Sequence, residues 1–220
     1  MICLALECST SRRSVAVARD GVTLAEAAHS AGRDTPLFGL IADVLARADL
    51  RVSDVACIAV GLGPGSYTGV RIAIAACQGW DVAQPLRLLG IPSVDATAHR
   101  AAQLGRRGRT AVITDAHRGE FYVAEFDLGP EGATPRSALR IATRPEIEAL
   151  RAAGVPCVGP DLEPLALGIS ADPVFPDASA LAALAQGRTD FVSAEALEPV
   201  YLRLPTFVKA PAGRTLAHPD

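Results

Sequence analysis

A glycine-rich segment from residue 63 to residue 72 carries the clearest chemical signal in the sequence. It reads Gly-Pro-Gly-Ser-Tyr-Thr-Gly-Val-Arg-Ile and follows an apolar stretch, residues 56–60, that is predicted to be a buried strand. Gly63 and Gly65 permit positive φ angles and close backbone approach, and Ser66 is a preferred helix N-cap. A strand, a glycine turn and a helix start can hold an anion on free amides. The spacing matches neither the Walker loop nor the dinucleotide fingerprint, so a tight turn with a capped helix is the competing interpretation.

Two carboxylates, Glu7 and Asp115, each follow a predicted strand and could meet across a cleft. Paired carboxylates could hold Mg²⁺ with a nucleotide or transfer protons. Carboxylates at hairpin tips also commonly accept local N–H bonds, and this alternative stays open. Ser66 lacks the Gly-x-Ser-x-Gly setting of a nucleophile, so it is interpreted as a cap. The four histidines are too scattered to pair on one helix face, and no metal site is expected.

The charge composition excludes several mechanisms. The net charge is −3, and Lys209 is the only lysine among 220 residues. A P-loop lysine, a Schiff base and a serine-lysine dyad would each require a lysine in the folded core. The chain also lacks the net positive charge and the dense basic stripe of a dedicated nucleic-acid binder.

The apolar segments and the cysteines indicate a reduced, intracellular setting. No apolar run approaches the length of about 20 residues that a membrane span needs, and Glu7 interrupts the opening strand too early for a leader. We therefore expect a cytoplasmic protein without membrane contact. The five cysteines form no Cys-x-x-Cys pair and lie mostly in apolar segments, which favours reduced core thiols over disulfides or zinc.

An internal duplication becomes visible when the sequence is shifted by 108 positions. Residues 4–7 then fall on residues 112–115, and Val15-Ala16 falls on Val123-Ala124 without a gap. Each copy reads as a strand, a polar turn that begins with a carboxylate, and a second strand. Strand-led segments followed by helices in both halves predict an α/β protein of two related lobes, in which Glu7 and Asp115 occupy equivalent positions facing one cleft.

Two predicted helices, at residues 36–48 and 66–84, have more apolar surface than one sheet can cover. In the second of them we expect Gly69, Ala73, Ala76 and Ala83 to pack closely on the sheet. A loop, the other lobe or a partner protein could cover the remaining faces. For a partner interface we expect the following residues: Phe38, Ile41, Ala42, Leu45, Tyr67, Val70, Arg71 and Ile74.

The segment from Gly63 to Ile72 resembles the signature of the TsaB (YeaZ) family, bacterial subunits of the tRNA threonylcarbamoyladenosine machinery. Three further segments agree with that family in the same order, namely Leu4–Thr10, Asp115–Tyr122 and Glu198–Arg203. The resemblance covers about residues 2–205. It implies the actin-like, hexokinase-like (ASKHA) fold with a second lobe that is smaller or degenerate.

The resemblance also implies a function. Similar proteins are non-catalytic partners of the catalytic paralogue TsaD and, with the ATPase TsaE, support threonylcarbamoylation of the tRNA adenosine beside the anticodon. We expect no intrinsic cofactor, ATP or ADP only within the complex, tRNA contact through the complex, and a homodimer when the chain is alone. The alternative is an autonomous actin-like-fold phosphotransferase or peptidase that uses the interlobe cleft.

The resemblance and the composition together divide the chain into an N-terminal lobe (residues 1–104), a C-terminal lobe (105–205) and a flexible tail (206–220). Two positions depart from the family pattern, because Glu7 stands where aspartate is usual and Asp34 where histidine is frequent. If a nucleotide binds, the residues expected beside it are Glu7, Ser9, Thr10, Gly63, Gly65, Ser66 and Asp115.

Overall fold

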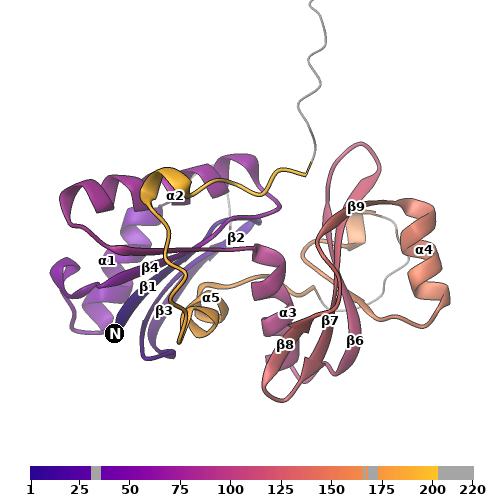
Figure 1. Cartoon of the computed structure of the whole chain (residues 1–220), viewed down its shortest axis with the longest axis horizontal. Coiled ribbons are helices and arrows are strands. Elements are labelled where there is room, and N and C mark those ends of the chain that lie inside the picture. Colours follow the sequence, from indigo (N-terminus) through magenta and orange to yellow (C-terminus); the bar gives the residue numbers. More distant parts are fainter. Residues whose placement is uncertain (31–35, 166, 168–172, 203–220) are drawn as a thin grey trace, which may run out of the picture.

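The computed structural model of the protein describes residues 1–30, 36–165, 167 and 173–202. It has two α/β lobes side by side, each built on one β-sheet (Figure 1). Asp34 and the tail at 206–220 lie outside the described residues. None of the helices in the described ranges combines the length and the hydrophobicity needed to span a bilayer.

The first lobe contains a five-stranded sheet in the order β3-β2-β1-β4-β5. Strands β1, β4 and β5 are parallel, and β2 and β3 continue the sheet antiparallel. The bounds are β1 (Ile2–Glu7), β2 (Arg12–Arg19), β3 (Val22–Ser30), β4 (Cys57–Gly61) and β5 (Arg87–Ile91). The central strands β1 and β4 are buried on both faces, which explains their nearly continuous apolar sequences.

Helices cover both faces of this sheet. Helices α1 (Leu37–Arg47) and α2 (Tyr67–Ala83) pack on one face, where Leu4, Leu6 and Val60 meet Ile41 and Ile74 in the main core. A short 3₁₀ turn, η1 (Val52–Asp54), connects α1 to β4. The opposite face carries small side chains and is covered by the alanine-rich helix α5 (Ala178–Ala185), which can lie close to the strands for that reason.

The second lobe contains strands β6 to β10, in the order β10-β6-β7-β8 with β9 also paired to β7. Their bounds are β6 (Gly108–Asp115), β7 (Glu120–Gly129), β8 (Gly132–Pro135), β9 (Arg140–Thr143) and β10 (Cys157–Val158). Helix α4 (Arg144–Ala152) packs on one face and α3 (Ser93–Gln103) on the other. A 3₁₀ turn, η2 (Glu163–Leu165), follows β10.

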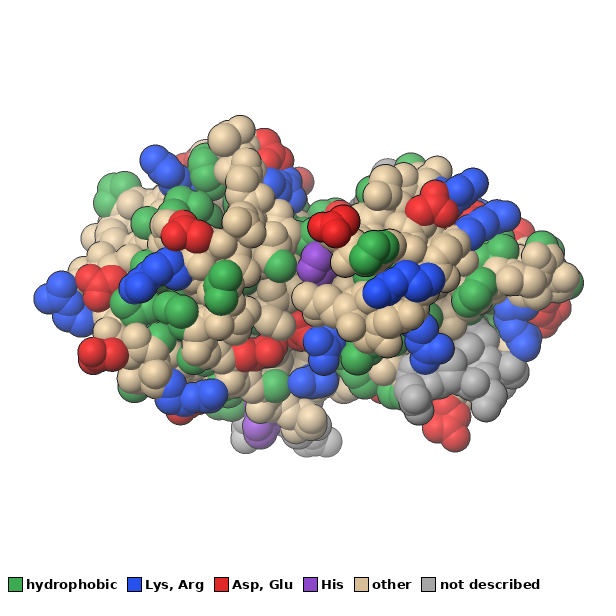
Figure 2. Space-filling model, turned by 90° about the horizontal axis from the view of Figure 1, so that it is seen from below, with side chains coloured by type: hydrophobic (Ala, Val, Ile, Leu, Met, Phe, Trp, Pro, Cys, Tyr) green, Lys and Arg blue, Asp and Glu red, His purple; other side chains and the backbone are tan. Residues whose placement is uncertain are grey.

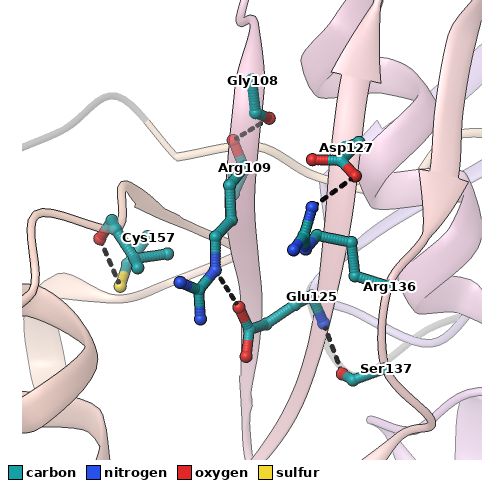
Figure 3. A network of polar contacts seen from close by, with 9 residues as sticks. Gly108, Arg109, Glu125, Asp127, Arg136, Ser137 and Cys157 are labelled. Atoms are coloured by element: carbon teal, nitrogen blue, oxygen red, sulfur yellow. Dashed lines mark hydrogen bonds and ion pairs between the residues drawn. The ribbon is translucent and has the colours of Figure 1, made fainter.

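Polar contacts support the strand pairing in this second sheet (Figure 3). Arg109 donates to the Glu125 carboxylate at 2.6 Å, and Arg136 donates to Asp127 at 2.7 Å. The backbone N–H of Glu125 donates to the Ser137 hydroxyl at 3.0 Å. Because opposite charges on neighbouring strands favour one pairing over its shifted alternatives, these contacts help fix β6, β7 and the segment after β8 in register.

The two lobes exchange elements. Helix α3 leaves the first sheet after β5 and packs on β6, β7 and β8, whereas α5 leaves the second sheet and packs on the first. The C-terminal segment then stays on the first lobe, where Val192 N–H donates to Leu88 O and Val200 N–H donates to Leu62 O, both at 2.9 Å. A 3₁₀ turn, η3 (Ala194–Ala196), lies over α2. The domain boundary after residue 104 stays a prediction. Each sheet is covered by a helix that follows the strands of the other sheet, so a cut in the sequence does not separate the two lobes in space.

The second sheet repeats the first, because β10-β6-β7 reproduces the order and directions of β4-β1-β2. The predicted ungapped offset is nevertheless wrong by one residue in the first strand. Leu6 pairs with Val15 and lies on the α1 side, while Ile113 pairs with Val123 and lies on the α4 side. Leu6 is therefore equivalent to Ile113 rather than to Thr114, and the second hairpin turn has one more residue.

This shift places the two predicted carboxylates on opposite faces of their sheets, since neighbouring strand residues alternate in direction. Glu7 continues the row of Cys3 and Ala5, which faces α5. Asp115 continues the row of Ala111 and Ile113, which faces the α4 side. The prediction that Glu7 and Asp115 are equivalent and face one cleft is wrong, although the duplication itself is present in the sheet order.

The glycines around residues 61–69 allow two backbone segments to touch. A Cβ on Gly65 would lie 2.1 Å from the Ser9 carbonyl oxygen, and a Cβ on Gly69 would lie 2.0 Å from that of Cys8. Ser66 N–H donates to Ser9 O at 2.6 Å, and the Ser66 hydroxyl accepts from Gly69 N–H at 3.2 Å as the N-cap of α2. These glycines therefore position the start of α2 against the turn after β1.

We expect Gly69→Ala to lower the free energy of unfolding by about 3 kcal/mol, because the new methyl group would collide with backbone that has no rotamer to change. Gly79→Ala in the same helix is the matched control, since among the described residues no atom beyond its own helical backbone and chain neighbours lies within 4 Å of its added Cβ. That control should be neutral or stabilising by up to about 1 kcal/mol. Urea unfolding of both variants measures the difference, and equal stabilities would contradict the proposed backbone contact.

Candidate functional site

A cleft of about 310 Å³ opens between the two lobes at the turns that follow β1 and β6. The first lobe contributes residues 9–11 and 65–67, and the second contributes the turn after β6 and the loop after β10. Five of the seven residues expected near a nucleotide line this cleft, namely Ser9, Thr10, Gly65, Ser66 and Asp115. Glu7 and Gly63 lie behind the cleft and do not line it. The sequence therefore predicted the position of the cleft, but it assigned two residues too many to the lining.

Hydroxyl groups and carboxylates dominate the cleft. Ser11 donates across the lobes to Asp161 at 3.0 Å, and His117 N–H donates to Asp115 at 2.8 Å. The His117 ring nitrogen Nδ1 lies 3.3 Å from the second Asp115 oxygen. Of the described residues that line the cleft, none is lysine or arginine. Two carboxylates without a lysine or arginine beside them disfavour phosphate, so a nucleotide here would need a cation or a residue from a partner.

Glu7 has a structural role behind the cleft. Its side chain is fully buried and accepts hydrogen bonds from Ser9 N–H at 2.7 Å and from the Ser93 hydroxyl at 2.8 Å. Ser93 also accepts from Gly63 N–H at 3.1 Å and donates its own N–H to Gly63 O at 2.7 Å. Burial raises the pKa of Glu7 above its ordinary value. The carboxyl thus joins the end of β1, the glycine loop and the start of α3.

Ser93 was missed at the sequence level, although one signal was available. It follows Pro92 directly and begins α3, a position where a serine is expected to bond locally. Its bond to a carboxylate 86 positions earlier depends on tertiary structure and cannot be seen in one sequence. No cluster of three or more His, Cys, Asp or Glu side chains suited to a metal ion occurs among the described residues.

An apolar groove of about 540 Å³ lies on the outer side of the first lobe, between α1 and α2. Phe38 lies at its edge and is 70% exposed, which is unusual for a phenylalanine. The side chains that line the groove are almost all apolar: Phe38, Ile41, Ala42, Leu45, Val52, Ala75, Ala76, Gly79, Trp80 and Ala83. Four of the eight predicted interface residues, those of α1, line this groove.

The predicted faces of α2 require a correction. Val70 and Ile74 were expected to point away from the sheet, but both are buried in the main core beside Ala73 and Cys77. The larger side chains of this row fill the space over β1 and β4, whereas a helix placed by its alanines alone would leave a void. Ala76 and Ala83, expected against the sheet, instead line the groove. Ala75, Gly79 and Trp80 were missed for the same reason.

Tyr67 and Arg71 are exposed at the start of α2, as predicted, but they lie outside the groove. The Arg71 guanidinium lies 3.8 Å from the centre of the Tyr67 ring, and its Nε donates to the Tyr201 hydroxyl at 2.9 Å. The cluster therefore fastens the C-terminal segment to α2 beside the cleft. Its aromatic and arginine side chains are of the types that contribute most to protein interfaces.

The mixture of charges on the surface agrees with the absence of a basic stripe in the sequence. Figure 2 shows one face on which arginine side chains alternate with acidic ones over both lobes, with a narrowing between the lobes. Such a face gives no extended positive potential for a phosphate backbone.

Taken together, the two repeated α/β sheets and the cleft between them define an actin-like (ASKHA-type) protein.

Within that class, comparison with known proteins identifies the family. Residues 19–143 match the family model described as "TsaD: tRNA N6-adenosine threonylcarbamoyltransferase". The chain is 30% identical over 145 residues to the tRNA threonylcarbamoyladenosine biosynthesis protein TsaB of Escherichia coli, a match that covers 66% of this chain and 63% of that protein. The chain belongs to the TsaB (YeaZ) family.

The chain is also similar to a further relative and to two solved structures. An uncharacterised protein of Mycobacterium tuberculosis is 34% identical over 159 residues, which covers 68% of this chain and 70% of that protein. The solved structure of YeaZ from Pseudomonas aeruginosa superposes with a TM-score of 0.77 at 28% identity, over 91% of this chain and 99% of that one. A second Pseudomonas aeruginosa structure, described as similar to peptidase YeaZ, gives a TM-score of 0.79 at 29% identity, over 92% and 99% of the two chains.

The buried carboxyl of Glu7 predicts a pH dependence of stability. In the unfolded chain Glu7 has its ordinary pKa of 4.5, and in the folded protein burial raises the pKa. Between these values the folded protein holds a proton that the unfolded chain has lost, so this group lowers stability as the pH rises above 4.5. Glu7→Gln removes the titration, and its stability relative to the parent should therefore increase with pH across that window.

Urea unfolding at a series of pH values measures this effect. Glu131→Gln, at an exposed position of the second lobe, is the control for the general change in net charge. If the difference in the free energy of unfolding between the parent and Glu7→Gln does not change with pH, Glu7 is not buried in this way.

Proposed function

We propose that this chain is a non-catalytic partner subunit in tRNA threonylcarbamoyladenosine biosynthesis and that it binds a TsaD-related paralogue through the groove between α1 and α2. The groove is the observation that carries the proposal. The pathway is supported by the names of the Escherichia coli and Haemophilus influenzae relatives. The choice of partner is supported by the TsaD family model, whose match includes both helices.

The groove has the properties of a docking site. It combines an exposed aromatic at the rim with a floor of small side chains, so an inserted apolar side chain would be desolvated on both sides. Apolar concavities of this kind are uncommon on the free surface of a monomer. A protein that fits the same family model has counterparts of α1 and α2, and two such helix pairs can pack as a four-helix arrangement about a pseudo-twofold axis.

Several features favour a supporting role over catalysis. The Ser66 hydroxyl caps α2, and Glu7 is occupied by two hydrogen bonds in the interior. Among the described residues that line the cleft, there is no lysine or arginine of the kind that neutralises charge in phosphoryl transfer. The proposal therefore includes a TsaE-like ATPase as a further partner and contact with tRNA through the complex. It also includes nucleotide binding only within that complex, self-association of the chain through the same groove, and a cytoplasmic location.

One observation favours the alternative of an autonomous phosphotransferase or peptidase. His117 and Asp115 form a pair in the cleft, near the hydroxyls of Ser9, Thr10 and Ser66. A histidine oriented by a carboxylate is the usual base of a serine nucleophile. In this cleft, however, His117 is exposed and Ser66 already serves as the helix cap, so the pair lacks a positioned nucleophile.

The docking proposal predicts that Ala42→Glu and Ala75→Glu abolish binding without unfolding the protein. Both residues are exposed in the free chain and line the groove, so a carboxylate there becomes buried and unpaired only on association. We expect the affinity for a TsaD-related paralogue to fall by roughly 100-fold or more, which corresponds to about 3 kcal/mol. Ile74→Asp is unsuitable for this test because Ile74 belongs to the core.

Ala46→Glu is the matched control. Ala46 is exposed on α1, one turn beyond Ala42, and does not line the groove. Titration calorimetry with the paralogue, together with thermal unfolding of each variant, separates binding from stability. Parent-like affinity in Ala42→Glu and Ala75→Glu would place the interface elsewhere, and an equal loss in Ala46→Glu would show that the effect is not local.

The non-catalytic role predicts that the purified chain shows no turnover with ATP, threonylcarbamoyl-adenylate, tRNA or peptides. The reason is that the described residues lining the cleft include no positioned nucleophile and no lysine or arginine. Product formation assayed with and without the paralogue provides the measurement. Turnover that follows this chain through purification and disappears in Asp115→Asn would favour the phosphotransferase or peptidase alternative.

A further inference from the structure

Two cysteines face each other near the N-terminal ends of two central strands of the first sheet. Cys3 in β1 is the direct register partner of Cys57 in the parallel strand β4. Both side chains belong to the cluster of small residues on the α5 side of the sheet. Neighbouring strands lie about 4.8 Å apart. This separation falls within the Cα distances of about 4.4–6.8 Å that a disulfide spans.

The two thiols are also in contact and are electrostatically unequal. The hydrogen bond to Cys57 raises the pKa of Cys3, whereas the same contact lowers the pKa of Cys57. The charge of Arg87 lowers the pKa of Cys57 further, since Arg87 is its register partner in β5. The thiolate therefore forms preferentially at Cys57, with the thiol of Cys3 beside it.

A hollow lies at the N-terminal ends of β1, β4 and β5, next to this pair of buried cysteines. It has a volume of about 670 Å³ and is lined by Met1, Ala56 and Arg87, among others. Ala56 precedes Cys57 in the chain, and Met1 lies two residues before Cys3. Slight opening at the start of β1 would thus expose both sulfurs to a small reagent, without disruption of the main core on the opposite face of the sheet.

The remaining three cysteines are buried, as this pair is, but they differ from it in their pairing. Burial raises the pKa of Cys8 and of Cys77 to about 12 each, and it also raises the pKa of Cys157. None of the three is a register partner of another cysteine in the described sheets. They serve as internal controls within the same molecule.

We propose that Cys3 and Cys57 form a redox-active dithiol, a modification site at which a low-molecular-weight disulfide produces a reversible bond between β1 and β4. The Cys57 thiolate attacks one sulfur of the reagent and releases one thiolate. Cys3, after losing its proton to solvent, attacks the mixed disulfide at Cys57 and releases the second. Two protein thiols are oxidised, and one external disulfide is reduced to two thiols.

The geometry also predicts that this disulfide is easily reduced. Side chains at directly paired positions of parallel strands are separated by about the strand spacing, whereas a relaxed disulfide needs a Cβ separation of about 3.5–4.5 Å. The bond must therefore pull the strands together, and strained disulfides have more oxidising potentials than structural ones. Mild reductant should restore both thiols in the folded protein.

The test is oxidation of the full-length native protein with glutathione disulfide, followed by alkylation of free thiols and peptide mapping. We expect loss of the thiols at positions 3 and 57 in one linked peptide pair, at a rate roughly tenfold or more above that of Cys77, and full recovery with dithiothreitol. Cys3→Ser should accumulate glutathione at Cys57. Cys57→Ser should leave Cys3 unmodified.

Two results would overturn the proposal. The first is retention of free thiols at positions 3 and 57 while circular dichroism shows a folded protein. The second is loss of all five cysteine thiols at one common rate, which would show that oxidation follows global unfolding. The parent protein alone distinguishes these outcomes, so the proposal stays testable if either serine variant fails to fold.

Discussion

The close contact between the glycine loop and the turn after β1 is the constraint on which the other features depend. Gly65 and Gly69 let the start of α2 lie directly on the backbone of Cys8 and Ser9. The buried carboxyl of Glu7 then connects this junction to Ser93 at the start of α3. Helix α2 forms one wall of the outer groove, and Ser66 lines the interlobe cleft. The shape of both therefore depends on this junction.

This contact changes the meaning of the glycine-rich segment. Glycine-rich turns before a helix often leave amides free for a phosphate. Here the carbonyl oxygen of Ser9 occupies the space beside Gly65 and that of Cys8 the space beside Gly69, and the Ser66 N–H donates to Ser9 O. The second interpretation raised by the sequence, a tight turn with a capped helix, therefore describes the segment better than an anion cradle does.

Much of the fold could be predicted from the sequence because its signals are local. Alternation and apolar runs identify β1 and β4, and the N-cap at Ser66 marks the start of α2. The one-residue difference between the hairpins could not be predicted, because an ungapped comparison has no information on strand pairing. That single residue decides which side of the sheet Asp115 occupies.

The two helices that line the groove were predictable to different degrees. On α1 the predicted interface residues Phe38, Ile41, Ala42 and Leu45 all line the groove. Helix α2 is apolar around much of its circumference, so its orientation depends on which row fills the core best. The row with Val70 and Ile74 is larger than the alanine row, and packing density favours it over the sheet.

The exchange of helices between the lobes has a consequence for the order in which the protein can be completed on the ribosome. The strands of the first sheet are synthesised within the first 91 residues, but the helix that covers their alanine-rich face begins only at Ala178. Until that helix emerges, Ala5, Ala16 and Ala59 lack their cover, and the first lobe is an unfinished layer rather than a folded domain. A nascent chain that pauses in the second lobe would therefore present this bare face to chaperones and to other chains.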